Sequence, residues 1–280
     1  MKRLKTLLAF AVILLLSMSL LCACNQPAEE ETGDNEKVVS GMLAINISSE
    51  EEVNAAFHEL GWNVEVKFFE DLNSLIMALR SGKIEKIDRL PECTARYLVA
   101  RNEDLDLWVS SPEDDLGIQY YLGVPGDDQE TYDILNDAMT AMENDGTVDG
   151  LIAEYIDAYM EGSDEPAPAE MPEFPGAKTI KIAITGDLPP FDYVSADGQP
   201  AGFNVALLAE IAQRTGVNIE PVSTNAASRA MSLSSDAVDA IFWLTGDNVS
   251  KSEIGSGDFP EGIKLIGPYY ECASCIVRMK

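Results

Sequence analysis

The sequence feature that most constrains the fold is an internal repeat. Residues 61–90 and 216–244 carry nearly the same pattern, and residues 71–90 align with residues 225–244 without a gap. Six of the twenty aligned positions are identical, and in the first copy these are Ser74, Met77, Leu79, Ser81, Ile87 and Leu90. Both copies read as strand, helix and strand, which is the pattern of a parallel βαβ unit. The repeat predicts two similar α/β lobes with one ligand cleft between them.

The first residues predict export and a lipid anchor. Lys2, Arg3 and Lys5 precede the apolar run Leu7–Leu21, which is short for a membrane span and is followed by polar, acidic residues. The run ends in a Leu-Cys-Ala-Cys sequence that resembles the bacterial lipobox, and this resemblance makes Cys24 the lipid-modified first residue of the mature chain. A lipid-modified Cys24 would hold the protein at the extracytoplasmic face of a bacterial cell membrane. An ordinary signal peptide, cleaved to release a free protein, stays open as the alternative.

The charge of the chain excludes some partners. The formal net charge is −29, and removal of residues 1–23, which hold three basic and no acidic residues, leaves −32. Such acidity argues against nucleic acid and anionic lipid head groups as partners. The acidity would keep an exported protein soluble, and we favour this explanation over one in which the acidic residues serve ligand binding.

Two polar stretches divide the mature chain. Residues 24–40 are rich in Glu and lack aromatic residues, which predicts a disordered tether. Residues 161–177 are rich in Pro, which predicts a stiff, extended connector. We therefore expect a first α/β lobe at residues 41–160 and a second at residues 178–280, joined by this Pro-rich linker and each large enough to bury its own core.

Alternation of apolar strands with helical periodicity predicts an α/β fold with doubly wound, mostly parallel sheets. The expected helices span residues 49–60, 72–81, 91–101, 129–143, 148–159, 205–215 and 226–234. The expected strands span residues 42–47, 64–69, 84–87, 107–109, 119–124, 179–184, 218–222, 237–243, 264–266 and 274–278. Residues 185–202 and 245–262 read as long loops.

The loop after the strand at residues 179–184 is the first candidate for a ligand site. Ligands of open α/β sheets bind outside the carboxyl ends of the strands, and this loop lies there. It carries Asp187, two prolines that stiffen it, and the aromatic residues Phe191 and Tyr193, which could form one wall of a pocket. Packing of Phe191 against its own sheet is the alternative.

Further along, residues 180–243 combine a strand, the Pro-Pro-Phe loop, the Gly202–Leu207 segment and the Leu233–Ile241 segment. This combination resembles the amino-terminal lobe of the family 3 extracellular solute-binding proteins of amino-acid ABC importers. Residues 71–160 are similar to the end of the family's other lobe, so the two lobes would stand in swapped order. The resemblance implies a type II periplasmic-binding fold, an amino-acid-like solute, a membrane permease as partner, and no catalysis.

The chain departs from this family in the residues that bind solute. The family's arginine for an α-carboxylate would fall on Lys251, which offers charge without the bidentate geometry of a guanidinium. The family's acid for an amino group would fall near Leu90, two residues after Asp88. These departures weaken, without excluding, the recognition of a standard α-amino acid.

Other candidates for the cleft follow strands of the two predicted lobes. In the first lobe they are Asp88, Arg89, Glu92 and Arg96, although Glu92 and Arg96 are four residues apart and could pair on a solvated helix face. In the second lobe Trp243 ends a strand and could equally be core, while Thr245 begins the next loop. Arg229, near a helix start, favours a structural role.

Cys272 and Cys275 form a Cys-x-x-Cys motif, which suggests thiol chemistry or half of a metal site. They lie in a predicted strand, where residues three apart face opposite sides, and His58 is the one histidine. We therefore predict neither a metal nor a cofactor. The leading hypothesis is a lipid-anchored solute receptor. A scaffold or sensor lipoprotein with a degenerate pocket, and an enzyme that uses these cysteines or Asp187 and Asp192, are the alternatives.

Overall fold

The computed structural model describes residues 37–44, 49–59, 61, 63–109, 117–160, 166–225, 228–247 and 262–280. Its first strands and helices are β1 (Val38–Leu43), α2 (Glu50–Glu59), β2 (Val64–Phe69), α3 (Leu72–Arg80), β3 (Lys86–Pro91), α4 (Glu92–Arg101) and β4 (Leu105–Val109). The middle of the chain forms β5 (Ile118–Pro125), α5 (Gln129–Asn144), α6 (Thr147–Ile152), η1 (Ala153–Asp157) and α7 (Ala158–Met160).

The second half begins with β6 (Thr179–Ile184) and the three short strands β7 (Asp187–Leu188), β8 (Asp192–Val194) and β9 (Pro200–Ala201). It continues with α8 (Phe203–Thr215), β10 (Asn218–Ser223), α9 (Arg229–Ser234), β11 (Ala240–Asp247), β12 (Ile263–Cys272) and β13 (Ser274–Met279). The small sheet β7-β8-β9 occupies residues that we expected to be a long loop.

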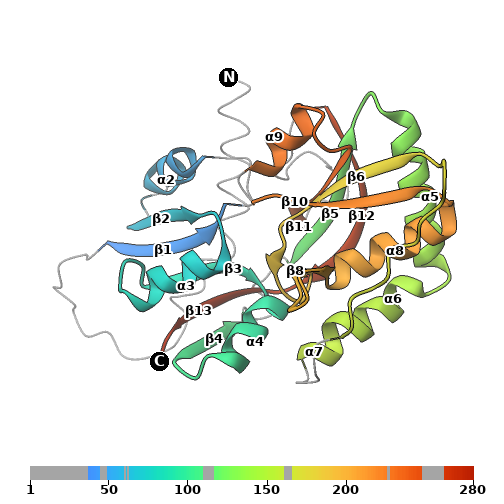
Figure 1. Cartoon of the computed structure of the whole chain (residues 1–280). Helices are drawn as coiled ribbons and strands as arrows, with labels where there is room; N and C mark the ends of the chain where they lie inside the picture. The colour runs from blue at the N-terminus through green and yellow to red at the C-terminus, as the bar shows by residue number, and fades with distance from the viewer. Residues whose placement is uncertain are drawn as a thin grey trace.

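The strands form two five-stranded sheets of the same plan, which confirms the α/β fold with two sheets. Sheet A has the order β2-β1-β3-β13-β4, and sheet B has the order β10-β6-β11-β5-β12. In each sheet the first three strands are parallel and the fourth is antiparallel to its neighbours, so both sheets are mixed. We call sheet A with α2, α3 and α4 lobe A, and sheet B with α5 to α9 lobe B. They lie side by side in Figure 1.

The internal repeat is visible in the capping of equivalent helices. The Asp71 carboxylate accepts a hydrogen bond from the Ser74 amide at 2.7 Å at the start of α3. At the same place in lobe B, the Asn225 side-chain oxygen accepts one from the Ser228 amide, also at 2.7 Å, just before α9. Both short polar side chains satisfy an amide that the helix leaves unpaired.

Each lobe takes its fourth strand from the other half of the sequence, and this corrects the predicted lobe boundaries. The expected division at residues 41–160 and 178–280 would place β5 in the first lobe and β13 in the second. Instead β5 pairs with β11 and β12 of sheet B, and β13 pairs with β3 and β4 of sheet A. Sequence periodicity identifies a strand but not its neighbours, because the hydrogen bonds of a ladder involve only the backbone.

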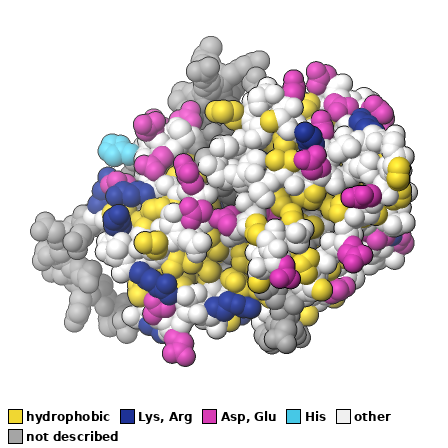
Figure 2. Space-filling model, in the orientation of Figure 1, with side chains coloured by type: hydrophobic (Ala, Val, Ile, Leu, Met, Phe, Trp, Pro, Cys, Tyr) yellow, Lys and Arg dark blue, Asp and Glu magenta, His cyan; other side chains and the backbone are white. Residues whose placement is uncertain are grey.

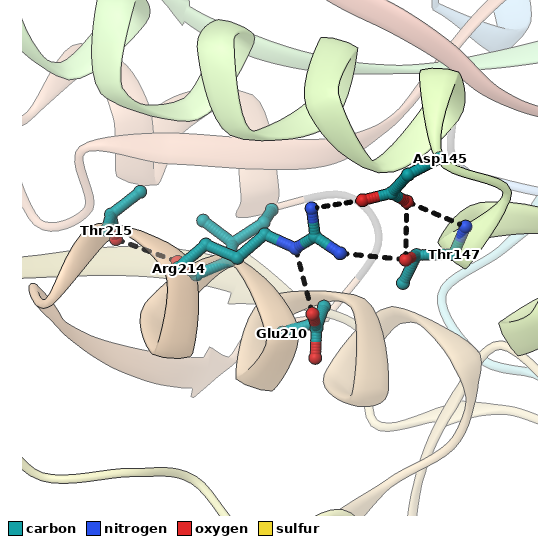
Figure 3. Close-up of polar contacts among 6 residues, drawn as sticks. Asp145, Thr147, Glu210, Arg214 and Thr215 are labelled. Carbon is teal, nitrogen blue, oxygen red and sulfur yellow. Dashed lines mark hydrogen bonds and ion pairs between the residues drawn. The ribbon is translucent and has the colours of Figure 1, made fainter.

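Helices α5 and α6 also belong to lobe B. The Arg214 guanidinium of α8 forms an ion pair of 2.7 Å with Asp145, between α5 and α6, and donates to the Thr147 hydroxyl at 2.7 Å. Glu210 completes the network at 2.8 Å from the Arg214 Nε atom (Figure 3). The Arg214 guanidinium and the Thr147 hydroxyl and amide together lower the pKa of Asp145 to about 2.

The Pro-rich stretch is part of lobe B and does not join the lobes, as we had expected it to do. In its described part, residues 166–177, Phe174 donates its amide to the Asn218 side chain at 2.8 Å and accepts from the same side chain at 3.0 Å. Ala169, Met171 and Phe174 pack against the main hydrophobic cluster. The lobes are instead connected between β12 and β13, at Ala273, and between β4 and β5, where residues 110–116 lie outside the described part.

The predicted signal peptide, Cys24 and most of the tether lie outside the described residues. Strand β1 begins at Val38, so the predicted tether, residues 24–40, overlaps the first strand by three residues. Val39 and Ser40 are partly or fully buried there, which explains why they belong to the sheet. None of the helices in the described part is long and apolar enough to pass through a bilayer.

Candidate functional site

A pocket lies where the two lobes meet. Its lining comes from both sheets: Met42, Leu43, Asp88 and Arg89 belong to lobe A, and Ile118, Tyr120 and Thr245 to lobe B. It holds about 330 Å³ of empty space, open solvent included. Leu43 and Arg89 lie at or near the carboxyl ends of parallel strands of sheet A, and Thr245 lies near the carboxyl end of β11 in sheet B. This is the edge at which α/β sheets bind ligands.

Asp88 supplies the negative charge of the pocket. Its side chain accepts a hydrogen bond from the Ser40 hydroxyl at 2.7 Å and forms an ion pair of 2.8 Å with Lys86. All three side chains are largely shielded from solvent, so the ion pair is held in place by its surroundings. The Asp88 carboxylate has further lone pairs with which it can accept from a bound cationic group.

Arg89 supplies the positive charge. Its backbone adopts a φ of +58°, a left-handed conformation that is uncommon for a residue other than glycine. Such a conformation costs free energy and is found preferentially at functional sites. A guanidinium at the pocket offers the bidentate geometry that matches a carboxylate.

Tyr120 supplies an uncommitted polar group. Its side chain is fully buried, and its hydroxyl has no hydrogen-bond partner among the described residues. Burial raises the pKa of Tyr120 well above its usual value, and the nearby Arg89 charge partly opposes that rise. A buried hydroxyl without a partner costs about 1–3 kcal/mol, and a ligand or a water molecule in the pocket would remove that cost.

The aromatic residues predicted for the site support the pocket from behind. Phe191 is fully buried, with its ring centroid 4.7 Å from that of Trp243 and 5.7 Å from that of Tyr120. Tyr193 is 7% exposed, and none of Phe191, Tyr193 and Trp243 is among the residues that line the pocket. Phe191 and Tyr193 therefore do not form a wall of this pocket. Their rings pack into the core of lobe B, where burial of aromatic surface is most favourable.

Asp192 holds the Pro-Pro-Phe loop in place. Its fully buried carboxylate accepts from the amides of Thr185 and Gly186 at 2.9 Å each, from the Thr185 hydroxyl, from the Asn204 amide group at 2.7 Å and from the Trp243 indole at 2.8 Å. A carboxylate with this many donors has a structural role, because its lone pairs are already used. This arrangement speaks against Asp192 as a catalytic acid.

Asp187, in β7, makes a hydrogen bond across to lobe A. Its carboxylate accepts a hydrogen bond of 3.1 Å from the Leu72 amide at the start of α3, across 115 residues of sequence. Burial raises the pKa of Asp187 to about 6, and the opposing hydrogen bond from Leu72 lowers it only in part. Asp187 is absent from the pocket lining, so in this structure it contacts the other lobe and not the pocket.

The remaining predicted residues separate into four groups. Asp88 and Thr245 line the pocket, as expected for cleft residues. Arg96 lies on an exposed helix face, where it forms an ion pair of 2.6 Å with Glu92, and this is the alternative that the four-residue spacing left open. Arg229 is buried and donates to the Trp243 carbonyl at 3.2 Å, in line with a structural role. Lys251 lies outside the described residues.

The sequence interpretation missed Met42, Leu43, Ile118 and Tyr120. Tyr120 stood in a strand that we assigned to the wrong lobe, so nothing placed it near Thr245, its partner in the β5–β11 ladder. The signal that could have found it is the run of polar and aromatic residues in β5, an unusual composition for a strand that neighbours two others. With β5 placed in sheet B, the pocket residues of the two sheets face each other.

The part of the chain that includes the Pro-Pro-Phe loop, α8, α9 and β11 also matches a known family. Residues 180–250 match the family model of bacterial extracellular solute-binding proteins, family 3. This is about a quarter of the chain. A search of curated proteins finds no match.

Solved structures give remote likenesses. The ligand-binding component of an ABC-type import system from Staphylococcus aureus, solved with zinc bound, has 11% identity and a TM-score of 0.41, over 86% of this chain and 65% of that one. The substrate-binding protein of an amino-acid ABC transporter has 15% identity and a TM-score of 0.37, over 87% and 85%. The regulatory domain of OxyR from Pseudomonas aeruginosa has 9% identity and a TM-score of 0.38, over 86% and 87%. At these scores the likenesses assign neither ligand nor activity.

Proposed function

We propose that this protein is a lipid-anchored, extracytoplasmic solute-binding protein. It captures a small polar, amino-acid-like solute between its two lobes and presents it to an ABC permease in the membrane, without making or breaking a bond. The match of residues 180–250 to the solute-binding family supports this assignment. The observation that carries it is the pocket between the lobes, with Arg89 and Asp88 on one side and Tyr120 and Thr245 on the other.

The charges of the pocket favour a solute with both an anionic and a cationic group. Arg89 is suited to a carboxylate, and Asp88, already held by Lys86 and Ser40, is suited to an ammonium group. The buried Tyr120 hydroxyl can supply a further hydrogen bond. Arg89 would thus replace the arginine that the family resemblance places at Lys251.

Titration calorimetry of the full chain with a panel of amino acids and amines tests this proposal. We expect at least one zwitterionic solute to bind and to raise the thermal unfolding midpoint. Arg89→Asn should abolish that binding, because Asn tolerates the left-handed backbone but lacks the guanidinium. Arg96→Asn, on the exposed face of α4, is the matched control and should bind as the wild type does. Equal binding by both variants, or no binding by any protein, contradicts the proposal.

A sensor or scaffold lipoprotein with a degenerate pocket is the second candidate. It is favoured by the departure at the family's arginine position, where this chain has Lys251. Genes beside the locus separate the two functions: a permease and an ATPase support import, whereas a sensor kinase supports signalling.

The lipid anchor has its own test. Metabolic labelling with a fatty-acid analogue should mark the wild type and place it in the membrane fraction. Cys24→Ala should lose the label and appear in the soluble extracytoplasmic fraction. An unlabelled wild type would mean that the ordinary signal peptide is the correct reading.

A further inference from the structure

Two cysteines meet at the place where the chain crosses from lobe B to lobe A. Strand β12 ends at Cys272, where it pairs with Ile118 of sheet B, and β13 begins at Ser274, where it pairs with Pro91 of sheet A. A single residue, Ala273, therefore separates the two sheets along the chain (Figure 1). Any covalent bond across this point would act directly on the connection between the lobes.

The end of the β3–β13 ladder brings Cys93 and Cys272 to the same crossover. Leu90 pairs with Cys275 and Pro91 with Ser274, and the ladder continues with a hydrogen bond of 3.1 Å from the Glu92 amide to the Ala273 carbonyl. Cys93 and Cys272 each stand one residue from this hydrogen bond, Cys93 in the first turn of α4 and Cys272 at the end of β12. A disulfide requires their Cα atoms to lie about 4.4–6.8 Å apart.

The surroundings of the two thiols agree with this placement. The Tyr270 hydroxyl is hydrogen-bonded to the Cys93 sulfur, and the charge of Cys272 acts on Cys93. Cys93 is fully buried at the start of α4, whereas Cys272 is half-buried and can be reached from solvent. The described part of the chain contains one further cysteine, Cys275, which is 1% exposed and opposes Leu90.

We propose that Cys93 and Cys272 form a reversible disulfide that ties α4 of lobe A to the end of β12 in lobe B. The expected site is thus a redox-sensitive bond at the crossover, distinct from the Cys272–Cys275 pair that the sequence motif suggests. In the oxidised protein the bond restricts the angle between the lobes. In the thiol form the crossover is free to bend at Ala273.

The chemistry requires an oxidant, and a small-molecule disulfide or an extracytoplasmic thiol–disulfide exchange protein supplies it. The Cys272 thiolate attacks the oxidant's disulfide, forms a mixed disulfide and releases one thiol. The Cys93 thiolate then attacks the Cys272 sulfur and releases the second thiol. The two cysteines lose two protons and two electrons, and the oxidant's disulfide is reduced to two thiols. Burial raises the pKa of Cys93 well above its usual value, so the second step should be slow and should accelerate as the pH rises.

Peptide mass spectrometry of the full chain tests the bond directly. The protein is treated with oxidised glutathione or with a reductant, its remaining thiols are alkylated, and it is digested with trypsin. We expect a cross-link between the peptide of residues 90–96 and that of residues 265–278 in the oxidised sample. The cross-link should persist in Cys275→Ser and vanish in Cys272→Ser. A cross-link within the peptide of residues 265–278, or none in the oxidised wild type, overturns the proposal.

Thermal unfolding and hydrogen exchange test the effect on the lobes. Oxidation should raise the unfolding midpoint of the wild type and of Cys275→Ser by about 5 °C or more, because a long loop of the unfolded chain is closed. It should leave Cys272→Ser unchanged. The Leu72 amide, which donates to Asp187 across the lobes, should exchange more slowly in the oxidised wild type. If the Leu72 amide exchanges its hydrogen at the same rate in both redox states, the disulfide does not restrict the movement of the lobes and that part of the proposal is wrong.

These measurements use no solute, so they are independent of the proposed transport function. The cross-link can be present in a protein that binds nothing, and a solute can bind in a protein that forms no cross-link. Only the consequence for uptake, a slower exchange of solute in the oxidised protein, rests on the proposed function.

Discussion

Arg89 and Trp243 occupy equivalent places in the two lobes and are used differently. The internal repeat aligns them, and both have a left-handed backbone, with φ values of +58° and +68°. Arg89 lines the pocket, whereas Trp243 is buried and donates its indole hydrogen to Asp192. The same backbone device thus presents a charge to the cleft in lobe A and anchors a loop in lobe B. The two copies of the repeat therefore share the backbone conformation at this position, although the side chains have different roles.

The lobes differ also in charge. Residues 37–109 contain eight Lys and Arg against thirteen Asp and Glu, whereas residues 118–247 contain four against twenty-three. In Figure 2 much of the dark blue surface accordingly lies over lobe A, on the left. The acidity of the chain therefore belongs mainly to lobe B, and the cationic contribution to the pocket comes from the lobe that is closer to neutral.

The largest expected difference between the lobes comes from Trp243. Trp243→Ala should lower the free energy of unfolding by about 3–5 kcal/mol, because it opens a cavity among the aromatic rings and removes one of the donors to the buried Asp192 carboxylate. Urea unfolding followed by circular dichroism measures this loss. Met231→Ala, at a side chain that is 71% exposed, is the control and should change stability by less than about 0.5 kcal/mol. Similar losses in both variants would refute the structural role of Trp243.

Asp187 tests the contact between the lobes as a function of pH. Its pKa is raised to about 6 in the folded protein, so the charged form is disfavoured there and folding is favoured as the pH falls from above 6 towards 4. Asp187→Asn should keep the hydrogen bond from Leu72 and raise the free energy of unfolding at pH 7.5 by up to about 2 kcal/mol. At pH 4 the two proteins should be nearly equal. A constant difference from pH 4 to pH 7.5 would contradict the raised pKa.

Removing the helix caps should have a smaller effect on stability, and this effect should depend on pH in lobe A but not in lobe B. Asp71→Ala and Asn225→Ala should each cost about 1 kcal/mol at pH 7. The hydrogen bonds from Ser74 lower the pKa of Asp71, so its contribution is present above its unfolded-state pKa and is lost as the pH falls through the lowered value. The cost of Asn225→Ala should not change with pH. Parallel pH profiles of unfolding for the two variants would refute this distinction.

The smallest effect on stability is expected at Arg89. Arg89→Asn should change the free energy of unfolding by less than about 0.5 kcal/mol, since the guanidinium faces the pocket and Asn accepts the left-handed backbone. Thermal unfolding without solute measures this value. A large loss would mean that Arg89, like Trp243, serves the packing of its lobe.

The sequence predicted the elements better than their partners. Strands β2 and β6 have the predicted bounds, and most helices differ by one to three residues, because apolar periodicity and capping residues mark them locally. Strands β5 and β13 were assigned to the wrong lobes because the local sequence of a strand does not indicate which distant strand it pairs with. Sheet β7-β8-β9 was missed because two or three residues are too few to show an alternating pattern.

The same limit explains the site. Asp88 and Thr245 could be proposed as cleft residues because each follows the predicted end of a strand in the repeat, and both line the pocket. Phe191 and Trp243 could not be separated from core residues, because an aromatic ring has the same apolar character in a pocket and in a core. Tyr120 required knowledge of the sheet order. The sequence therefore could not assign a role to residues whose role depends on which strands and side chains lie next to them in the folded protein.

The position of β13 far along the chain from β3 and β4 affects how the protein folds during synthesis. Until residues 274–279 have been synthesised, β3 and β4 each lack the neighbour that β13 provides, and their unpaired backbone edges invite association with other chains. Sheet A must therefore wait for a strand that is made much later than its neighbours, and such distant pairing slows folding. We expect a chain truncated before Ser274 to aggregate or be degraded and to depend on holding chaperones.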